Sequence, residues 1–156
     1  MSDRSTSSPA STVVVRAATE ADFAPVSALL AELGRPEVTP ATEDAVRATY
    51  LRHIASPASS ALIAERDGRA IGFIALHIRD RLSQPRPEAW VPDLIVTTSE
   101  HGGGAAQALL AAALEIARER GCYRLALESH YHRLRAHRFY EREGFTDAGK
   151  CFYIKL

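Results

Sequence analysis

Residues 94–110 read LIVTTSEHGGGAAQALL. The apolar run Leu94–Val96 favours a β-strand, and the alanines and leucines after Gly104 recur at the spacing of an amphipathic helix that ends at Gly121. Glycines let the backbone turn tightly and come close to a ligand. The first amides of a helix lack partners inside the helix and attract anions. The stretch therefore predicts a phosphate-binding turn between a strand and a helix, with a strand-to-helix turn that binds nothing as the alternative.

Two common nucleotide-binding signatures are missing from this turn. The chain has no G-x-x-x-x-G-K-[ST] loop, and Gln107 stands where the pattern G-x-G-x-x-G, begun at Gly102, requires its third glycine. We therefore expect neither a nucleoside triphosphate loop nor a dinucleotide-binding fold.

Local patterns along the rest of the chain alternate between strands and helices. Asp67-Gly68 stands between two apolar runs, which is typical of a β-hairpin, and Pro92 indicates an edge position or a bulge in its strand. Thr19 and Asp22 resemble a capping box at the start of the first helix. We expect strands at residues 13–15, 61–65, 70–78, 90–96, 125–128 and 151–156, and helices at 23–33, 41–55, 105–120 and 134–143. This order predicts an α/β domain of the α+β type, with a single mixed, largely antiparallel sheet flanked by helices.

Length and composition fit one globular domain. The 156 residues are 46% hydrophobic and 24% charged, with 19 basic against 19 acidic side chains. This balance gives no global attraction to nucleic acid or to a membrane. No apolar stretch of about 20 residues is present to span a membrane, and the polar residues 1–11 indicate a flexible N-terminal tail rather than a signal peptide. We expect one domain over residues 12–156, located in the cytoplasm.

The cysteines and histidines give no sign of a metal site. Cys122 and Cys151 suit a reducing cytoplasm, although a single bridge between them stays open. His130, His132 and His137 have no metal-ligand spacing with each other or with the cysteines, so we expect no metal cofactor.

Arginine is concentrated between residues 116 and 142. Seven arginines fall there against three glutamates. Guanidinium groups match the geometry of phosphate, so the cluster favours a polyanionic ligand, with a solvated helical surface as the alternative.

A second motif lies in residues 133–145, RLRAHRFYEREGF, which contain the pattern A-x-x-F-Y-E-x-x-G-F. Together with the glycine turn, it resembles the GNAT superfamily of N-acetyltransferases, which use acetyl-CoA. The strand Asp93–Val96 and the turn His101-x-x-Gly104 are similar to the other motif of that family. The resemblance covers everything after the N-terminal tail and implies the GNAT-like acyl-CoA N-acyltransferase fold.

The resemblance also implies that acetyl-CoA binds along the strand edge and at the glycine turn. We expect its contacts to come from Leu94, Val96, His101, Gly102, Gly103, Gly104, Ala105, Ala106, Gln107, Arg133, Ala136 and Phe139. Two of these depart from the family motifs, since His101 replaces an arginine or glutamine and Arg133 replaces an asparagine. The backbone amides of the turn would still hold the pyrophosphate, and Arg133 would supply a compensating charge or meet the 3′-phosphate of the coenzyme.

Tyr140 stands where the family has the general acid that protonates the coenzyme A thiolate. A phenol with a reference pKa of about 10 can donate to a thiolate with a reference pKa of about 8.5. An aromatic packed in the core is the structural alternative. The general base is less defined, because Pro92 stands where some relatives carry glutamate. Asp93 and Glu128 are the candidates, and each could instead be a hydrogen-bonded carboxylate at a strand end.

The sequence therefore predicts an N-acetyltransferase that moves the acetyl group of acetyl-CoA to a primary amine of a small molecule, by direct attack in a ternary complex. The resemblance implies that the first two helices and the loop Arg79–Glu88 shape the acceptor pocket. A non-catalytic acetyl-CoA-binding sensor or interaction module is the alternative, and nucleic-acid binding through the arginines is a third. We expect no nucleic-acid or membrane partner, and a homodimer as the commonest default.

Overall fold

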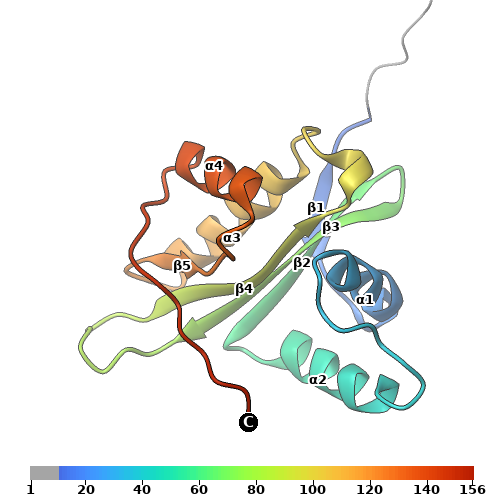
Figure 1. Ribbon diagram of the computed structural model, residues 1–156, viewed down its shortest axis with the longest axis horizontal. Helices are drawn as coiled ribbons and strands as arrows, with labels where there is room; N and C mark the ends of the chain where they lie inside the picture. Colours follow the sequence, from blue (N-terminus) through green and yellow to red (C-terminus); the bar gives the residue numbers. More distant parts are fainter. Residues whose placement is uncertain (1–10) are drawn as a thin grey trace, which may run out of the picture.

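The computed structural model describes residues 11–156 of the chain (Figure 1). The predicted tail, residues 1–11, lies outside the described residues except for Ser11. The strands are β1 (Val14–Ala17), β2 (Ser59–Arg66), β3 (Arg69–Arg79), β4 (Glu88–Val96) and β5 (Leu125–Leu127), and the α-helices are α1 (Phe23–Glu32), α2 (Glu43–Ala55), α3 (Ala105–Glu119) and α4 (Leu134–Arg142). Short 3-10 helices at Glu20–Asp22 and Thr98–Glu100 precede α1 and the glycine turn.

The strands form one sheet in the order β1-β2-β3-β4-β5. All neighbouring strands pair antiparallel except β4 and β5, which are parallel, so the predicted mixed, largely antiparallel sheet is confirmed. At the predicted β2–β3 hairpin, Asp67 and Gly68 have φ values of 52° and 73°. Positive φ at both central residues is typical of a type I′ turn, whose twist matches that of the flanking strands.

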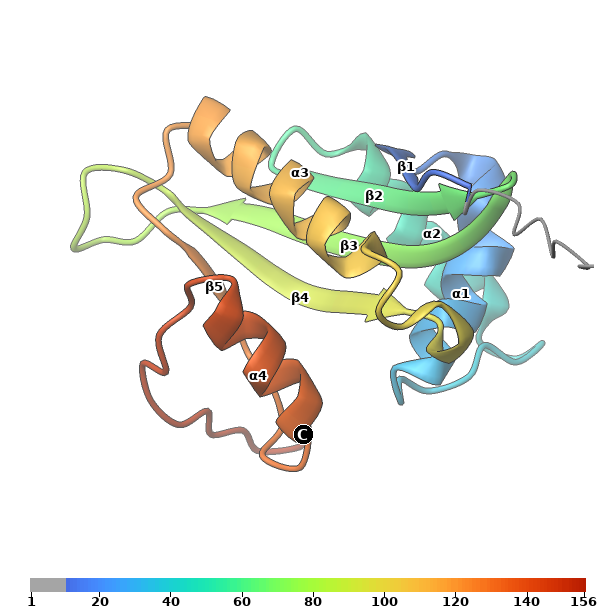
Figure 2. The ribbon, with the colours of Figure 1, turned by 90° about the horizontal axis from the view of Figure 1, so that it is seen from above.

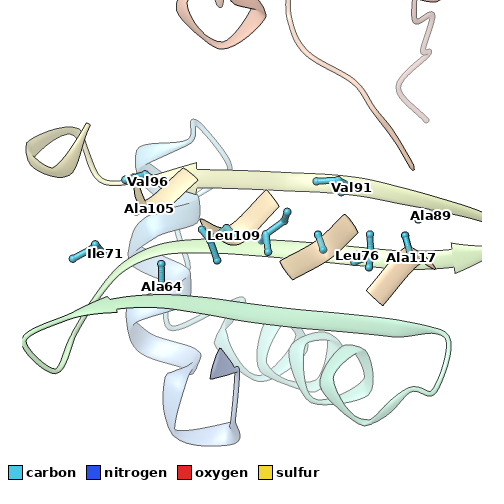
Figure 3. Close-up of a cluster of buried hydrophobic side chains, with 11 residues drawn as sticks. Ala64, Ile71, Leu76, Ala89, Val91, Val96, Ala105, Leu109 and Ala117 are labelled. Carbon is cyan, nitrogen blue, oxygen red and sulfur yellow. The ribbon is translucent and has the colours of Figure 1, made fainter. Parts of the chain in front are cut away.

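Helices cover both faces of the sheet. Figures 1 and 2 show α3 on one face and α1 with α2 on the other. Leu76, Val91 and Leu109 belong to the apolar cluster that joins α3 to the sheet (Figure 3), and a second cluster around Phe23 and Phe73 joins α1 and α2 to the opposite face. The apolar stripe predicted for residues 105–120 is therefore the face that seats α3.

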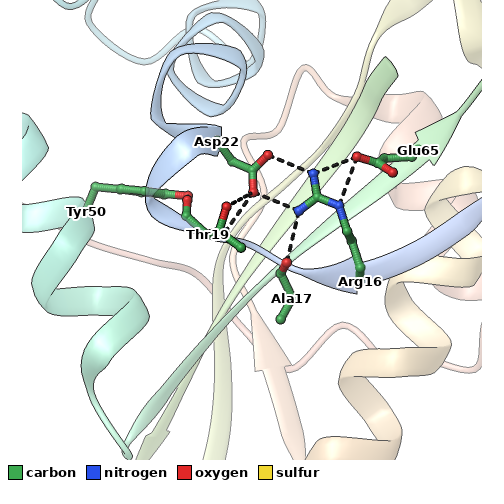
Figure 4. Close-up of polar contacts among 6 residues, drawn as sticks. All are labelled: Arg16, Ala17, Thr19, Asp22, Tyr50 and Glu65. Atoms are coloured by element: carbon green, nitrogen blue, oxygen red, sulfur yellow. Dashed lines mark hydrogen bonds and ion pairs between the residues drawn. The ribbon is translucent and has the colours of Figure 1, made fainter. Parts of the chain in front are cut away.

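An ion-pair network fixes the start of α1 to the sheet (Figure 4). The Arg16 guanidinium on β1 donates to Asp22 at 2.7 and 2.8 Å and to Glu65 on β2 at 2.6 Å. The Thr19 amide also donates to the Asp22 carboxylate at 2.7 Å, as the predicted capping box requires. Arg16 holds the pKa of Asp22 well below its usual range. Burial, together with the nearby Asp22 carboxylate, raises the pKa of Tyr50 to about 12.

The strands β4 and β5 part half-way along β4. Parallel pairs join the two strands only as far as Val91. Opposite Leu76 of β3, β4 carries an extra residue at Pro92, so the predicted bulge is confirmed. Beyond this bulge, β4 pairs with β3 on one side and has a free edge on the other. In Figure 2, β5 and α4 turn away from the long strands at this place.

The buried carboxylate of Glu88 holds β4 and β5 together before they part. Glu88 is 0% exposed and accepts hydrogen bonds from Arg79 at 2.7 Å and from Arg124 at 2.6 Å, with Arg81 at 3.6 Å. Burial alone would raise the pKa of this carboxyl, but the two hydrogen bonds outweigh burial and lower the pKa. Since Arg124 immediately precedes β5, the cluster fixes the point from which the strands diverge.

The prediction of a strand at residues 151–156 is wrong. This segment forms no strand and runs apart from the long strands (Figure 2). Its large apolar side chains are exposed: Phe152 by 87%, Tyr153 by 77%, Ile154 by 85% and Leu156 by 118%. A segment of high β-propensity forms a strand only beside a partner backbone, and here the segment does not pair with the outer edge of β5.

Candidate active site

A cleft of about 550 Å³ opens along the free edge of β4. Its walls are that edge, the glycine turn with the first turn of α3, and one face of α4. The lining residues are Glu32, Leu94, Ile95, Val96, Thr98, Glu100, His101, Gly102, Gly104, Ala105, Ala106, Gln107, Arg133, Arg135, Ala136, Phe139, Tyr140 and Arg142. The two sequence motifs, residues 94–110 and 133–145, thus meet at one cleft of the size of a small-molecule site.

The free edge of β4 presents backbone polar groups to the cleft. The Thr97 amide donates to the Ile71 carbonyl of β3 at 2.8 Å. The polar groups of successive residues point to opposite edges of a strand, so those of Leu94 and Val96 point away from β3 and toward the cleft. An extended ligand can pair with such an edge as an added strand does.

The glycine turn leaves the first amides of α3 without partners. Gly102 and Gly104 have φ values of 83° and 87°, which a residue with a side chain rarely adopts. No side chain caps α3 in the described part of the chain. The amides of Ala105, Ala106 and Gln107 therefore point at the cleft together with the positive end of the helix dipole, which is the arrangement that binds a phosphate.

Arg66, at the end of β2, braces this turn from outside. Its guanidinium donates to the Glu100 carboxylate at 2.9 Å, to the Gly103 carbonyl at 3.1 Å and to the Ser11 carbonyl. A Cβ at Gly103 would lie 2.9 Å from the guanidinium. Sequence reasoning missed Arg66, because a hairpin arginine far from the motif carries no local signal of this contact.

The two residues that depart from the family motifs both contact neighbouring backbone. The His101 ring lies 2.9 Å from the Val96 carbonyl, at the free edge of β4. The Arg133 guanidinium donates to the Leu33 carbonyl at the end of α1, so it joins α4 to α1 across the cleft. Both side chains line the cleft.

The Tyr140 phenol lies on the cleft face of α4. Its ring packs against Phe139 and Phe145, with centroids 5.5 and 5.6 Å away. Burial raises the pKa of this phenol, and the Arg133 charge only partly opposes the shift. Tyr140 is therefore protonated at neutral pH and able to donate a proton into the cleft.

The sequence of residues 26–145 matches the family described as Acetyltransferase (GNAT) family. The chain belongs to the GNAT family. It is a GNAT-type acetyltransferase, as two curated relatives also indicate.

Two curated relatives of this GNAT enzyme are named as N-acetyltransferases. It is 32% identical to aminoalkylphosphonate N-acetyltransferase of Salmonella typhimurium strain LT2 over 86% of this chain and 85% of that protein. It is 34% identical to glucosamine 6-phosphate N-acetyltransferase of Trypanosoma brucei brucei over 50% of this chain and 52% of that protein. The fold matches the aminoglycoside N-acetyltransferase AAC(6')-Iy, solved in complex with CoA, with a TM-score of 0.80, 22% identity, and coverage of 94% and 95% of the two chains.

The cleft of the GNAT domain suits the phosphates and the extended arm of acetyl-CoA. Three arginines add positive charge to the unpartnered amides: Arg133, Arg135 and Arg142. The two glutamates of the cleft are engaged elsewhere, since Arg66 holds Glu100 and the Thr97 hydroxyl donates to Glu32 at 2.9 Å. Part of the predicted arginine cluster thus lies at the cleft, whereas Arg124 binds Glu88.

Three predicted site residues lie outside the lining of the cleft. Gly103 directs its carbonyl to Arg66. Asp93 pairs with Arg35 at 2.7 Å. Glu128, just beyond β5, is exposed and accepts a hydrogen bond from the Cys151 thiol at 3.3 Å.

The described residues hold no cluster of metal ligands, no disulfide and no helix suited to cross a membrane. Among residues 11–156, no three His, Cys, Asp or Glu side chains gather as metal ligands would. Cys122 and Cys151 are both free thiols. Over the described range, no helix combines the length and apolar character needed to cross a membrane.

Proposed function

We propose that this enzyme transfers the acetyl group of acetyl-CoA to the primary amine of a small-molecule acceptor, by direct attack in a ternary complex. One observation carries the proposal: the unpartnered amides of the glycine turn and the Tyr140 phenol belong to the same cleft. The amides supply an anion site for the coenzyme phosphates, and the phenol supplies a proton donor.

In the proposed step, the amine nitrogen attacks the thioester carbonyl carbon, a C–N bond forms and the C–S bond breaks. Tyr140 donates its proton to the departing sulfur, and the amine nitrogen releases one. The raised pKa of Tyr140 supports this role, because the phenol must carry its proton when the thiolate forms. Product release then leaves Tyr140 to regain a proton from solvent.

The acceptor must arrive neutral or lose a proton near the site, since an alkylamine has a reference pKa of about 10.4. Of the two candidate bases, we favour Asp93, acting through water. Asp93 is next to the Pro92 bulge, where β4 leaves β5, and its ion pair with Arg35 keeps the carboxylate in place. Glu128, just beyond β5, is exposed and accepts a hydrogen bond from Cys151 in the C-terminal segment.

A small amine is the acceptor class that the relatives support. One relative is named for an aminoalkylphosphonate and the other for glucosamine 6-phosphate, so both names describe small amines. We extend that class to this enzyme.

Release of free thiol from acetyl-CoA across a panel of small amines tests the proposal, with calorimetric titration of coenzyme A alongside. We expect Tyr140→Phe to bind coenzyme A as the parent enzyme does and to lose about 100-fold or more in kcat. The matched control is Tyr131→Phe, because Tyr131 is an exposed phenol (73%) outside the cleft. Parent-like turnover in Tyr140→Phe would remove the phenol from the mechanism.

The same panel separates catalysis from sensing. A chain that binds coenzyme A but acetylates no amine would be a non-catalytic acetyl-CoA-binding module. A chain that binds no coenzyme A would contradict both functions.

We also propose a cytoplasmic location and a homodimer, without nucleic-acid or membrane partners. The exposed apolar side chains of residues 152–156 support self-association, because such a segment is unfavourable in water. Light scattering of the full chain against Ile154→Lys tests the dimer, which we expect the charge to weaken.

A further inference from the structure

A second hollow, of about 570 Å³, lies on the α1–α2 face of the sheet. It is formed by the C-terminal half of α2 and the paired ends of β3 and β4. His77 of β3 and Trp90 of β4 form its floor, and Thr49, Arg52 and His53 of α2 form one wall. The hollow is built partly by the second helix and by Arg79, the first residue of the loop predicted to shape the acceptor pocket.

The position of the hollow relates it to the reaction. Trp90 lies three residues before Asp93, about 10 Å along the strand, and the Pro92 bulge lies between them. Asp93 lies opposite Ala75, which belongs to the apolar cluster under α1 and α2, and His77 is two residues along β3 from Ala75, so Asp93 and His77 share this face of the sheet. Trp90 is next to Val91, the last residue of β4 that pairs with β5, so the hollow lies beside the place where the two strands part.

The polar groups of the hollow favour an anion. No Asp or Glu of the described chain lines it, whereas Arg52 and Arg79 do. Arg79 lies over the Trp90 ring, 4.8 Å from its centroid, and pairs with Glu88. Arg52 has only the Thr49 hydroxyl as a hydrogen-bond partner in the described residues, at 2.9 Å, so most of its donors are free.

The floor adds uncharged hydrogen-bonding groups. The His77 ring stacks on Trp90 at 5.7 Å and meets the edge of His53 at 4.7 Å. Burial, with the nearby His53 and Arg79, lowers the pKa of His77, so its ring is neutral near pH 7. The indole N–H of Trp90 is buried and has no hydrogen-bond partner in the described chain.

We propose that this hollow is the acceptor site, and that the acceptor carries an oxyanion that Arg52 binds while its primary amine lies toward the Pro92 bulge. The inference rests on the proposed acetyl transfer and adds the class of acceptor. The oxyanion is a phosphonate, phosphate ester or carboxylate, since all three offer oxygens to a guanidinium.

The chain's single tryptophan is Trp90, so its fluorescence reports on the hollow without any turnover. We expect 2-aminoethylphosphonate, β-alanine or glucosamine 6-phosphate to give a saturable change, and ethylamine, propylamine and glucosamine, which lack the oxyanion, to give none at the same concentrations. Arg52→Gln should weaken the oxyanion response about tenfold or more, and Arg52→Lys should restore part of it. Arg69→Gln removes an exposed arginine at the hairpin turn and should change nothing.

Kinetics then separates this inference from the proposed function. In at least one pair, kcat/KM should be about tenfold or more higher for the oxyanion-bearing amine, and Arg52→Gln should abolish that preference alone. Absence of a saturable fluorescence change with every oxyanion, or a preference that survives in Arg52→Gln, overturns the inference. In that case, turnover of the amines that lack an oxyanion leaves the acetyltransferase function standing. Binding of an oxyanion without turnover of any amine contradicts the function and not the site.

Discussion

Substitution of Gly104 by alanine separates the strain of the glycine turn from its role in binding. Gly104 has a φ of 87° and Gly68, in the β2–β3 hairpin, a φ of 73°. A Cβ at either position would meet no atom of the described chain within 4 Å. Both substitutions therefore carry the same cost, about 1–2 kcal/mol for a side chain in the left-handed region. Of these two glycines, Gly104 lines the cleft and Gly68 does not.

The strain should lower a different measured quantity in each variant: stability in Gly68→Ala and affinity for coenzyme A in Gly104→Ala. Gly68→Ala should lose the full amount in the free energy of unfolding, which lowers Tm by about 2–8 °C for a chain of this size. In Gly104→Ala the free turn can relax and re-aim the amides of Ala105 and Ala106. Coenzyme A must then restore the turn, and the new methyl group also occupies space beside the phosphates. We expect coenzyme A to bind about 5- to 30-fold more weakly.

Calorimetric titration of coenzyme A and thermal unfolding of both variants measure the two effects. An unchanged dissociation constant in Gly104→Ala would refute the assignment of these amides to the pyrophosphate. If Gly68→Ala weakened coenzyme A binding equally, any loss of stability would impair binding. A special role of the glycine turn in binding would then be refuted.

Three further perturbations test the support around the cleft. Arg66→Gln should weaken coenzyme A about 3- to 10-fold in the same titration by loosening the turn, and parent-like affinity would contradict the bracing role. Because the Asp22 pKa is lowered in the folded state, its ion pair contributes stability above the unfolded pKa of about 3.9, and this contribution disappears as pH falls below that value. Urea unfolding between about pH 5 and pH 2 should therefore show a smaller acid loss for Asp22→Asn than for the parent, and equal slopes would count against the network. Leu109→Ala, at a residue 0% exposed, should cost about 2–5 kcal/mol in urea unfolding, and a loss under about 1 kcal/mol would mean that α3 is not seated there.

Local signals in the sequence predicted the parts of the fold that short segments decide by themselves. The Asp67-Gly68 pair predicts its hairpin because few residues accept positive φ at both positions. The apolar stripe after Gly104 predicts α3, and the glycines before it predict a turn with free amides. Pro92 predicts the bulge because proline cannot donate to a neighbouring strand.

Long-range contacts could not be predicted in this way. Arg66 and Glu100 are 34 residues apart, and Arg133 and Leu33 are 100 residues apart. A surface arginine can pair with many carboxylates or carbonyls, and only the folded chain selects one. The sequence therefore indicated that arginines serve an anion site but not which of them hold the walls of the cleft.

The prediction of a strand at residues 151–156 was wrong for a different reason, because a local signal was present but a partner strand was not. Phe152, Tyr153 and Ile154 have high β-propensity, and propensity predicts how well a residue suits a pleated surface. It does not supply the second backbone on which a strand depends. The outer edge of β5 could pair with a strand, and this exposed segment has the residues of one, but the two do not pair within the chain.

The cleft and the hollow both depend on the same interruption of the sheet. A free strand edge normally exposes amides and carbonyls that invite aggregation. Here the Glu88 cluster holds β4 to β5 at one end, and the Pro92 bulge ends their pairing, so the free edge is confined to the stretch that α4 faces. The polar groups of Leu94 and the Val96 amide thereby become available to a ligand, while the Val96 carbonyl lies against the His101 ring. The same divergence gives an acceptor on the α1–α2 face a route to that ligand. A change that restored β4–β5 pairing beyond Val91 would stabilise the sheet and close the site.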